Sequence, residues 1–271
     1  MSLIINGKEI EHTEWIRSGK ELQLPYGKDV CWWDEGDYQT TKRAKNIDIL
    51  CGHWTAGEAG LATVEDDGPR VVYGMKNRMS EKFIGRKLKV SIAFVIGVCD
   101  PQDPEKEAAV WQCLDLGTTG NVHVGSGAVN SRSIGVEIVS AGVPGKLDVR
   151  RRPRAKKTLN GRSREIVLFY PGQIKAWNRL ANLLTLTPEN ALTREELDIA
   201  FKLDETGIRI PRQVPLATNG LLLSKKMTRK QMESFSGVIE HIHMFDTQKI
   251  DAALQCVESC KNNLGFKGVK V

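Results

Sequence analysis

The sequence lacks both a long hydrophobic run and a leader-like N-terminus, and these absences limit where the chain can act. No segment reaches the roughly 18 consecutive apolar residues that a membrane-spanning helix needs. Residues 1–12 contain no basic stretch followed by an apolar core, so no secretory signal is predicted. We therefore expect a chain made in the cytoplasm, whose action outside the cell would need release or delivery by another system.

A CxxC pair is also absent, and the cysteine spacing indicates neither a disulfide framework nor a cysteine metal site. The chain has six cysteines and no CxxC pair, which is typical of free thiols in a chain without an export signal. Cys256 and Cys260 stand one helical turn apart, as two small buried residues on one helix face would. Hydrophobic residues make up 41% and charged residues 27% of the chain, which indicates an ordinary folded protein and excludes a disordered one.

Basic residues exceed acidic ones, and much of the excess is local. The formal net charge is +6, and a basic run extends from Arg150 to Arg164. Such a run is typical of a solvated loop, and its functional interpretation is attraction to a polyanion such as nucleic acid, anionic lipid or a bacterial wall. No nucleic-acid recognition motif accompanies the run, which disfavours a DNA- or RNA-binding protein.

Apolar periodicity predicts strands in the first half of the chain and helices in the second. Strands are expected over residues 46–51, 87–98, 110–116 and 132–142. Helices are expected over residues 171–186, 192–203 and 251–265. Pro171 is placed to start the first helix, and Gly265 is placed to stop the last. This order predicts an α/β fold in which helices cover a mixed central sheet.

The same patterns suggest how the chain is divided. We expect a single main domain over residues 46–271, with a small β-rich lead-in over residues 1–45 packed on it. Two segments are interpreted as insertions in the main domain: the basic one at about residues 143–165 and an extended one at about residues 192–229. The TTGN stretch that begins at Thr118 is predicted to be a turn.

Histidine is rare, and its positions carry the candidate chemistry. The chain has five histidines, of which His12 lies in a charged stretch and is expected at the surface. A catalytic zinc ion needs three protein ligands, commonly histidine and carboxylate, and an open fourth position. Taken alone, His53 at the end of a strand is equally consistent with a buried structural histidine.

The string HWTAG, which begins at His53, closely resembles a known motif. It is similar to the HxTAG element that opens the zinc-dependent N-acetylmuramoyl-L-alanine amidases, a family that includes phage amidase lysozymes and peptidoglycan recognition proteins. In that family the leading histidine binds zinc, so the resemblance gives His53 a ligand role. Trp54 and Thr55, in the same string, become candidate substrate-binding residues.

A second element, HVGSGAVNSRSIGVEIV, begins at His123 and resembles the HAG…N..SIGIEI segment of the same family. In the family this histidine and asparagine line the substrate cleft, and the glutamate faces the metal-bound water. The resemblance therefore assigns substrate contacts to His123 and Asn130 and a catalytic role to Glu137. A lone carboxylate within such an apolar strand would be costly to bury without a purpose.

The third element, GVIEHIHMFDTQKID, begins at Gly237 and resembles the closing GH…K.DPG motif. His241 and His243 compete for the ligand role in it. His241 is preferred because it stands ten residues before Asp251, a spacing that the family uses. The implied zinc site is His53, His241 and Asp251, with Lys249 placed to stabilise an oxyanion.

The resemblance covers about residues 46–260, with two departures from the family pattern. Ala252 and Ala253 stand where the closing motif has proline and glycine, so the resemblance does not predict the conformation of the loop after Asp251. Ala93, in the string SIAF, stands where the family's SxHF element has its histidine. Neither departure removes an implied zinc ligand, although each can alter how a substrate fits.

The resemblance implies a bacteriolytic hydrolase of the endolysin kind. The expected reaction is cleavage of the amide between N-acetylmuramic acid and the L-alanine of the stem peptide, by a zinc-activated water with Glu137 as general base. The expected partner is peptidoglycan or a muropeptide, with Arg150 to Arg164 drawing the enzyme to an anionic wall or membrane surface. The alternatives are a peptidoglycan-binding module without catalysis, disfavoured because all three ligand positions are filled, and a basic nucleic-acid-binding protein.

Overall fold

The computed structural model describes most of the chain, with gaps. The described residues are 2–5, 7–10, 13–21, 32–34, 40–43, 46–56, 91–100, 102–124, 126–145, 152–185, 207–244 and 250–271. His12, Lys249 and the helix expected over residues 192–203 lie outside these ranges, so the predictions for them stay predictions. None of the described helices is long and apolar enough to cross a membrane.

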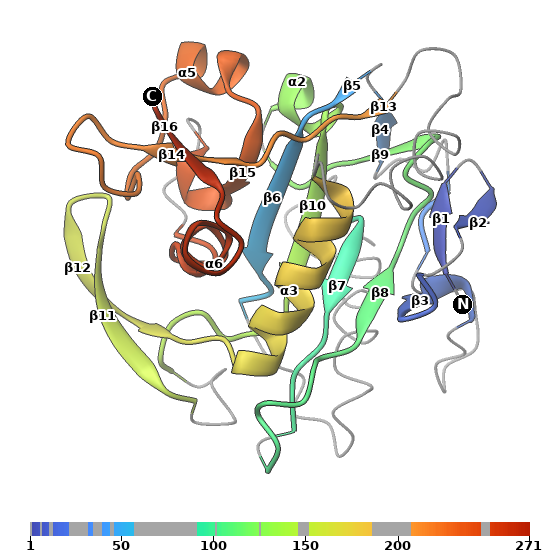
Figure 1. Ribbon diagram of the computed structural model, residues 1–271, viewed down its shortest axis with the longest axis horizontal. Helices are drawn as coiled ribbons and strands as arrows, with labels where there is room; N and C mark the ends of the chain where they lie inside the picture. Colours follow the sequence, from blue (N-terminus) through green and yellow to red (C-terminus); the bar gives the residue numbers. More distant parts are fainter. Residues whose placement is uncertain are drawn as a thin grey trace, which may run out of the picture.

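A six-stranded mixed sheet forms the centre of the described part of the chain, in the order β15-β6-β10-β7-β8-β3 (Figure 1). Its strands are β3 (Ile16–Ser18), β6 (Ile49–Trp54), β7 (Phe94–Ile96), β8 (Val110–Gln112), β10 (Ser133–Ile138) and β15 (Gly237–Glu240). Only the β7–β8 pairing in this sheet is antiparallel. The predicted mixed α/β fold is thus confirmed, and the lead-in supplies an edge strand, β3, of the central sheet.

Paired strands and bridging segments surround this sheet. The pairs are β1 (Leu3–Ile5) with β2 (Lys8–Ile10), β4 (Thr40–Lys42) with β9 (Thr119–Asn121), β5 (Asn46–Ile47) with β13 (Gly207–Ile208), and β14 (Gln213–Leu216) with β16 (Lys267–Lys270). The turn predicted for TTGN is wrong for most of its length, because Thr119–Asn121 is strand β9. Gly120 allows this pairing, since a Cβ there would lie 2.8 Å from the backbone oxygen of Thr41.

Two helices cover one face of the sheet, as the apolar spacing predicts (Figure 1). Helix α3 (Pro171–Leu184) begins at its proline, and α6 (Gln255–Asn263) ends shortly before Gly265, whose φ is 67°. Helix α6 packs directly on β6, because a Cβ at Gly52 would lie 2.8 Å from the Sγ of Cys256. The short helices are α2 (Gly127–Asn130), α5 (Arg229–Ser234), η1 (Gly19–Glu21) and η2 (His241–His243).

The alternation of side chains along β6 separates two environments. Leu50 and Trp54 point to the face that α3 and α6 cover and belong to the main hydrophobic core. Ile49 and Cys51 point to the other face, where they pack in a second apolar cluster with residues such as Met232 and Met244. Because His53 follows in the same alternation, its side chain lies on this second face, at the carboxyl end of the strand.

The basic run is a hairpin, and the expectation of a solvated loop is wrong for its described part. Strand β11 (Arg154–Leu159) pairs antiparallel with β12 (Arg162–Val167). Asn160 and Gly161 form the turn with φ values of 50° and 73°, the left-handed geometry that an Asn-Gly pair favours in a two-residue hairpin turn. The Asn160-Gly161 pair is thus a strong hairpin signal within the charged run.

Arg152, at the start of this segment, is an interior residue rather than part of a basic surface. Its side chain is 2% exposed and donates hydrogen bonds to the Oε1 of Gln173 at 2.7 Å and the backbone oxygen of Val139 at 2.8 Å. The guanidinium also lies 4.6 Å from the ring centre of Tyr170. Arg152 thus links the segment that precedes the hairpin to α3 and to the end of β10.

We expect Arg152→Met to lower the free energy of unfolding by about 2–4 kcal/mol, because two buried acceptors lose their charged donor. Urea denaturation measures the change. Arg154→Met, two residues along and on the exposed side of the hairpin, is the matched control and should change stability by less than about 0.5 kcal/mol. Equal effects of the two substitutions would contradict the structural role of Arg152.

Candidate metal centre

Three separate segments meet at the carboxyl end of the central sheet. His53 lies in β6, and His241 directly follows β15, the neighbouring parallel strand. Glu240 is the register partner of Gly52, so the residues that follow each of them, His241 and His53, lie side by side at the same edge. Asp251 lies in the turn that leads into α6.

The side-chain atoms of these three residues converge. The Nδ1 atoms of His53 and His241 are 3.0 Å apart, and the Oδ2 of Asp251 lies 2.9 Å from the His241 Nδ1 and 3.7 Å from the His53 Nδ1. Ligand atoms around a tetrahedral zinc ion with ordinary bond lengths lie about 3.4 Å from one another. Two nitrogens and one carboxylate oxygen at this spacing fit three corners of such a site, with the fourth corner left for another ligand.

The electrostatics of Asp251 also suit a metal ligand. Burial works against ionisation of this carboxyl, but the neighbouring imidazoles of His241 and His53 outweigh it and hold the pKa of Asp251 well below its ordinary value. The imidazoles of His53 and His241 are nearly inaccessible, with 1% and 4% of their surface exposed. The site therefore has an ionised carboxylate beside two shielded nitrogen donors.

His243 does not join this group. Its Nδ1 accepts the backbone N–H of Glu240 at 2.9 Å, and its Nε2 bonds to the backbone oxygen of Leu223 at 2.8 Å. Burial lowers the pKa of His243 to about 4, so the ring is neutral and carries its proton on Nε2. With both ring nitrogens bonded to the backbone, His243 is a structural histidine, and the geometry favours His241 as the ligand.

The turn after Asp251 is left-handed at three consecutive residues without glycine. The φ values of Ala252, Ala253 and Leu254 are 63°, 49° and 69°. The two alanines are those that replace proline and glycine of the resembled motif. The left-handed turn also explains why α6 begins at Gln255 rather than at 251, where the helix was expected. A left-handed residue other than glycine costs about 1–2 kcal/mol, so other contacts must hold the turn in place.

Glu240 provides those contacts. Its carboxylate accepts the backbone N–H groups of Leu254, Cys256 at 2.7 Å and Val257 at 3.1 Å. Burial raises the pKa of Glu240 to about 8, and these three donors oppose the rise. Because Glu240 precedes His241 in the chain, its bonds tie the turn that carries Asp251 to the strand end that carries His241.

A pair of alanine-to-glycine substitutions tests the strain in this turn. Ala253 and Ala181 are both fully buried, so each substitution removes a buried methyl group. Ala253→Gly relieves a left-handed alanine, whereas Ala181→Gly weakens the interior of α3. We expect Ala253→Gly to retain about 2 kcal/mol more stability than Ala181→Gly in urea denaturation. Equal losses would mean that the turn is not strained.

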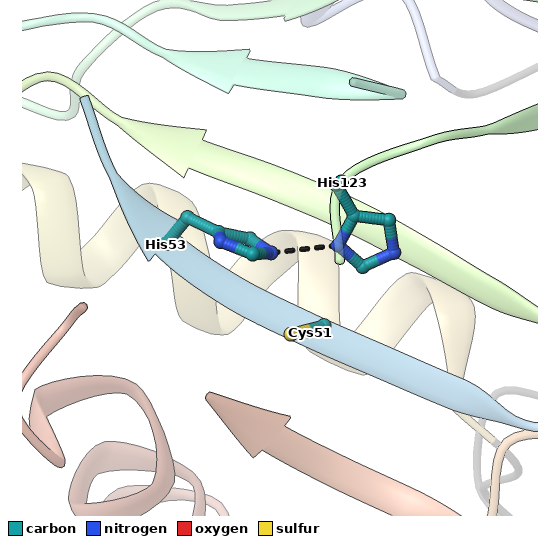
Figure 2. Close-up of side chains that lie close together, drawn as sticks. All are labelled: Cys51, His53 and His123. Carbon is teal, nitrogen blue, oxygen red and sulfur yellow. Dashed lines mark hydrogen bonds between the residues drawn. The ribbon is translucent and has the colours of Figure 1, made fainter. Parts of the chain in front are cut away.

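A second group of possible metal-binding side chains also includes His53. The Nε2 of His53 lies 2.7 Å from the Nδ1 of His123, and the two imidazoles point toward one another (Figure 2). Cys51, two residues earlier in β6, joins them in a group that could also hold a metal ion. Burial raises the pKa of the Cys51 thiol well above its ordinary value, and the charges of Glu240 and Asp251 raise it further. The group with Asp251 is the stronger candidate, because its carboxylate is already ionised, whereas the thiol would have to lose a proton to bind a metal ion.

His123 and Asn130, which the resemblance places at a substrate, are mostly enclosed, at 8% and 3% exposure. The Oδ1 of Asn130 accepts the backbone N–H groups of His123 at 3.1 Å and Val124 at 3.0 Å, and its Nδ2 donates to the backbone oxygen of Val124 at 2.8 Å. Asn130 thus holds the backbone that carries His123.

The side chains of Trp54 and Thr55 make contacts within the fold. Trp54 points to the helix-covered face, where its indole packs so closely over Gly142 that a Cβ there would lie 2.3 Å from the ring. The hydroxyl of Thr55 accepts the backbone N–H of Ser140 at 3.1 Å and donates to the Ser140 oxygen at 3.3 Å. In this arrangement both side chains stabilise the fold.

Glu137 lies beside His53, one of the candidate metal ligands. It is the register partner of His53 across the parallel β6–β10 pair, so both side chains point to the same face of the sheet. Glu137 is 9% exposed, and its Oε2 is buried. A carboxylate in this position can hold a proton next to a ligand bound at the metal.

No protein-family model, curated protein or solved structure matches the chain.

Sequence reasoning missed three residues that support the site: Glu240, Ser133 and Gly135. Glu240 stood next to a candidate histidine, but only its long-range contacts with α6 reveal its role. Ser133 and Gly135 carried a usable signal, because they alternate with Glu137 along β10 and therefore share its face. A Cβ at Gly135 would lie 2.7 Å from the Cγ of His123, so only glycine lets that imidazole lie against the strand.

Proposed function

We propose that the chain is a zinc-dependent N-acetylmuramoyl-L-alanine amidase, which cleaves the amide between N-acetylmuramic acid and the L-alanine of the stem peptide. The observation that carries the proposal is the convergence of His53, His241 and Asp251. These residues come from two separate motifs that resemble the amidase family, and their ligand atoms lie 2.9–3.7 Å apart. A finer prediction follows, that residues 46–271 have the amidase fold with insertions.

The donor set favours zinc over harder cations. Two imidazole nitrogens and one carboxylate oxygen are typical of catalytic zinc sites, whereas magnesium and calcium prefer oxygen ligands throughout. Zinc bound here would act as a Lewis acid and lower the pKa of water in its open position toward 7.

The chain's own residues supply the remaining chemistry. Glu137 would accept a proton from the attacking water and later pass it to the leaving amine, as a general base and then a general acid. Lys249 is proposed to stabilise the negative charge that develops on the amide oxygen. Burial of His53 and His241 shields their imidazoles from competing water.

Metal content and chelation test this proposal. The purified chain should contain about one zinc ion per molecule, and a strong chelator should abolish lysis of peptidoglycan until zinc is restored. A non-catalytic peptidoglycan-binding module is the second candidate, and it would bind wall fragments without releasing products. The proposal fails if the chain holds no zinc or if chelation leaves its activity unchanged.

The exposed basic side chains of the hairpin, which project from both of its faces, are proposed to bind the anionic wall. Arg154, Lys156, Arg162 and Arg164 are exposed, and the hairpin tip docks on a second basic segment through Asn160. The Asn160 N–H donates to the backbone oxygen of Ser224 at 2.8 Å, and its Oδ1 accepts the N–H of Lys226 at 3.2 Å. A pocket of about 740 Å³ lies between the tip and this segment and is lined in part by Lys225 and Lys226. Arg152 has no part in this surface.

We expect Arg162→Ser/Arg164→Ser to weaken association with insoluble wall and to spare turnover of a small soluble muropeptide. The control, Lys175→Ser/Arg179→Ser, removes the same charge from α3, where both cations pair with glutamates. Sedimentation with purified wall at two salt concentrations measures the association. Equal loss of binding and turnover would contradict the proposal, and steep salt dependence with DNA but not with wall would favour nucleic acid.

A further inference from the structure

His123 is a buried residue whose contacts the proposed function leaves unexplained. Its Nδ1 lies 2.7 Å from the Nε2 of His53, and its Nε2 lies 2.6 Å from the Oγ of Ser133. The rings of His53 and His123 meet edge to face, at an interplanar angle of 83°. The three polar groups are thus linked in a row that starts at the Nε2 of His53, whereas Asp251 lies nearer its Nδ1. Figure 2 shows the link between His53 and His123.

When both imidazoles are neutral, the hydrogen bonds that link His53, His123 and Ser133 can be donated in only two orders. In the first, His53 donates its Nε2 proton to His123, which donates its own Nε2 proton to Ser133. In the second, Ser133 donates to His123, and His123 donates to His53. A neutral imidazole carries one proton, so only the first order leaves the Nδ1 of His53 with a free lone pair.

The surroundings fix His123 at both its backbone and its ring. Asn130 bonds to the backbone on either side of the residue, as described above. The missing side chain of Gly135 leaves the space the ring occupies, since a Cβ there would lie 2.9 Å from the His123 Nδ1. At 8% exposure, the imidazole has little surface for contact with a substrate.

We propose that His123 is a positioning residue for the metal centre, which accepts the Nε2 proton of His53 and keeps the His53 Nδ1 unprotonated and directed at the metal. This inference rests on the proposed function, because it requires a metal ion held by His53, His241 and Asp251. It replaces the substrate contact that the family resemblance assigns to His123. Hydrogen bonds of this kind raise the basicity of a ligand and fix its orientation.

Two substitutions separate the hydrogen bond from the packing of the ring. His123→Phe keeps an aromatic ring but removes both nitrogens, and His123→Asn places an amide oxygen near the position of Nδ1. We expect zinc affinity, measured by competition with a chromogenic chelator, to fall about 10- to 100-fold in His123→Phe and to recover in part in His123→Asn. Thermal denaturation of both variants without metal shows how much of any loss comes from folding.

The proton itself gives a readout that does not depend on activity. In the zinc-loaded wild type, histidine nitrogen–proton correlation spectra should show a slowly exchanging proton on the Nε2 of His53. In His123→Phe this proton should exchange faster. Unchanged zinc affinity in His123→Phe, or a His53 that binds zinc through Nε2, would overturn the inference while leaving the amidase proposal standing. Absence of zinc from the wild type would instead defeat the proposed function.

Cys51→Ala is the matched control, because Cys51 belongs to the same group but not to the row of hydrogen bonds that links His53, His123 and Ser133. We expect the variant to keep one zinc ion per chain at wild-type affinity. If His53 instead bridged two ions, with Cys51 and His123 holding the second, the wild type would bind two ions per chain and Cys51→Ala would lose one. That result would overturn the positioning role of His123.

Discussion

Replacing Glu137 with glutamine is expected to lower the turnover of peptidoglycan by about 10²- to 10⁴-fold while zinc stays bound. Glutamine has nearly the same shape but cannot accept a proton. Because Glu137 lies opposite His53 in register, loss of its basicity should affect the reaction without disturbing the three ligands. The kcat for a soluble muropeptide and the zinc content of the same preparation measure the two effects.

Two other glutamates provide controls for Glu137→Gln. Glu165→Gln alters an exposed carboxylate on the hairpin and should leave turnover unchanged. Glu240→Gln alters a buried carboxylate that accepts three backbone N–H groups, so it should lower thermal stability as well as activity. If Glu137→Gln lost zinc or stability to the same degree as Glu240→Gln, a proton-transfer role for Glu137 would be untenable.

Replacing His241 with glutamine is expected to weaken zinc binding by at least about 10²-fold, because one of three ligands is lost. Isothermal titration of the metal-free chain with zinc measures the change. The neighbouring His243→Gln is the control, because both ring nitrogens of His243 bond to the backbone. It should keep its zinc affinity at low temperature and lose stability instead, by about 1–3 kcal/mol. The reverse outcome would exchange the roles of the two histidines.

His243→Gln should also change how stability depends on pH. The pKa of native His243 is about 4, below the value of about 6.5 expected in the unfolded chain. As the pH falls through this window, the unfolded chain takes up a proton that the native chain does not, so the native state loses stability. His243→Gln should remove part of this acid sensitivity.

Of the elements that position the candidate metal ligands, β6 could be predicted from its local pattern, whereas β15, which precedes His241, was not predicted. An apolar strand that ends in small residues placed His53 at a sheet edge, and Pro171 marked the start of α3. The hairpin was missed because its Asn160-Gly161 turn lies within a charged run, and charge was taken as the stronger signal. The left-handed turn after Asp251 could not be predicted, since alanine does not favour that conformation and Glu240 holds it from another strand.

The contacts that support the candidate site could not be predicted from local sequence patterns, because they join segments far apart in the chain. His123 lies 70 residues from His53 in the chain, and their hydrogen bond depends on a glycine in a third segment. Likewise, Arg152 belongs to a basic run by sequence, although its contacts with Val139 and Gln173 place it in the interior. Sequence patterns predicted which residues converge at the candidate site better than which residues support them.

Mass analysis of peptidoglycan digested by the zinc-loaded chain tests the central proposal most directly. The proposed amidase should release stem peptides with a free L-alanine amino group and leave intact glycan strands whose N-acetylmuramic acid residues carry free lactyl carboxylates. Glu137→Ala at the same concentration should release almost none. Cleaved glycan strands, cuts within the stem peptide, or undiminished release by the variant would contradict the proposed bond or the proposed role of Glu137.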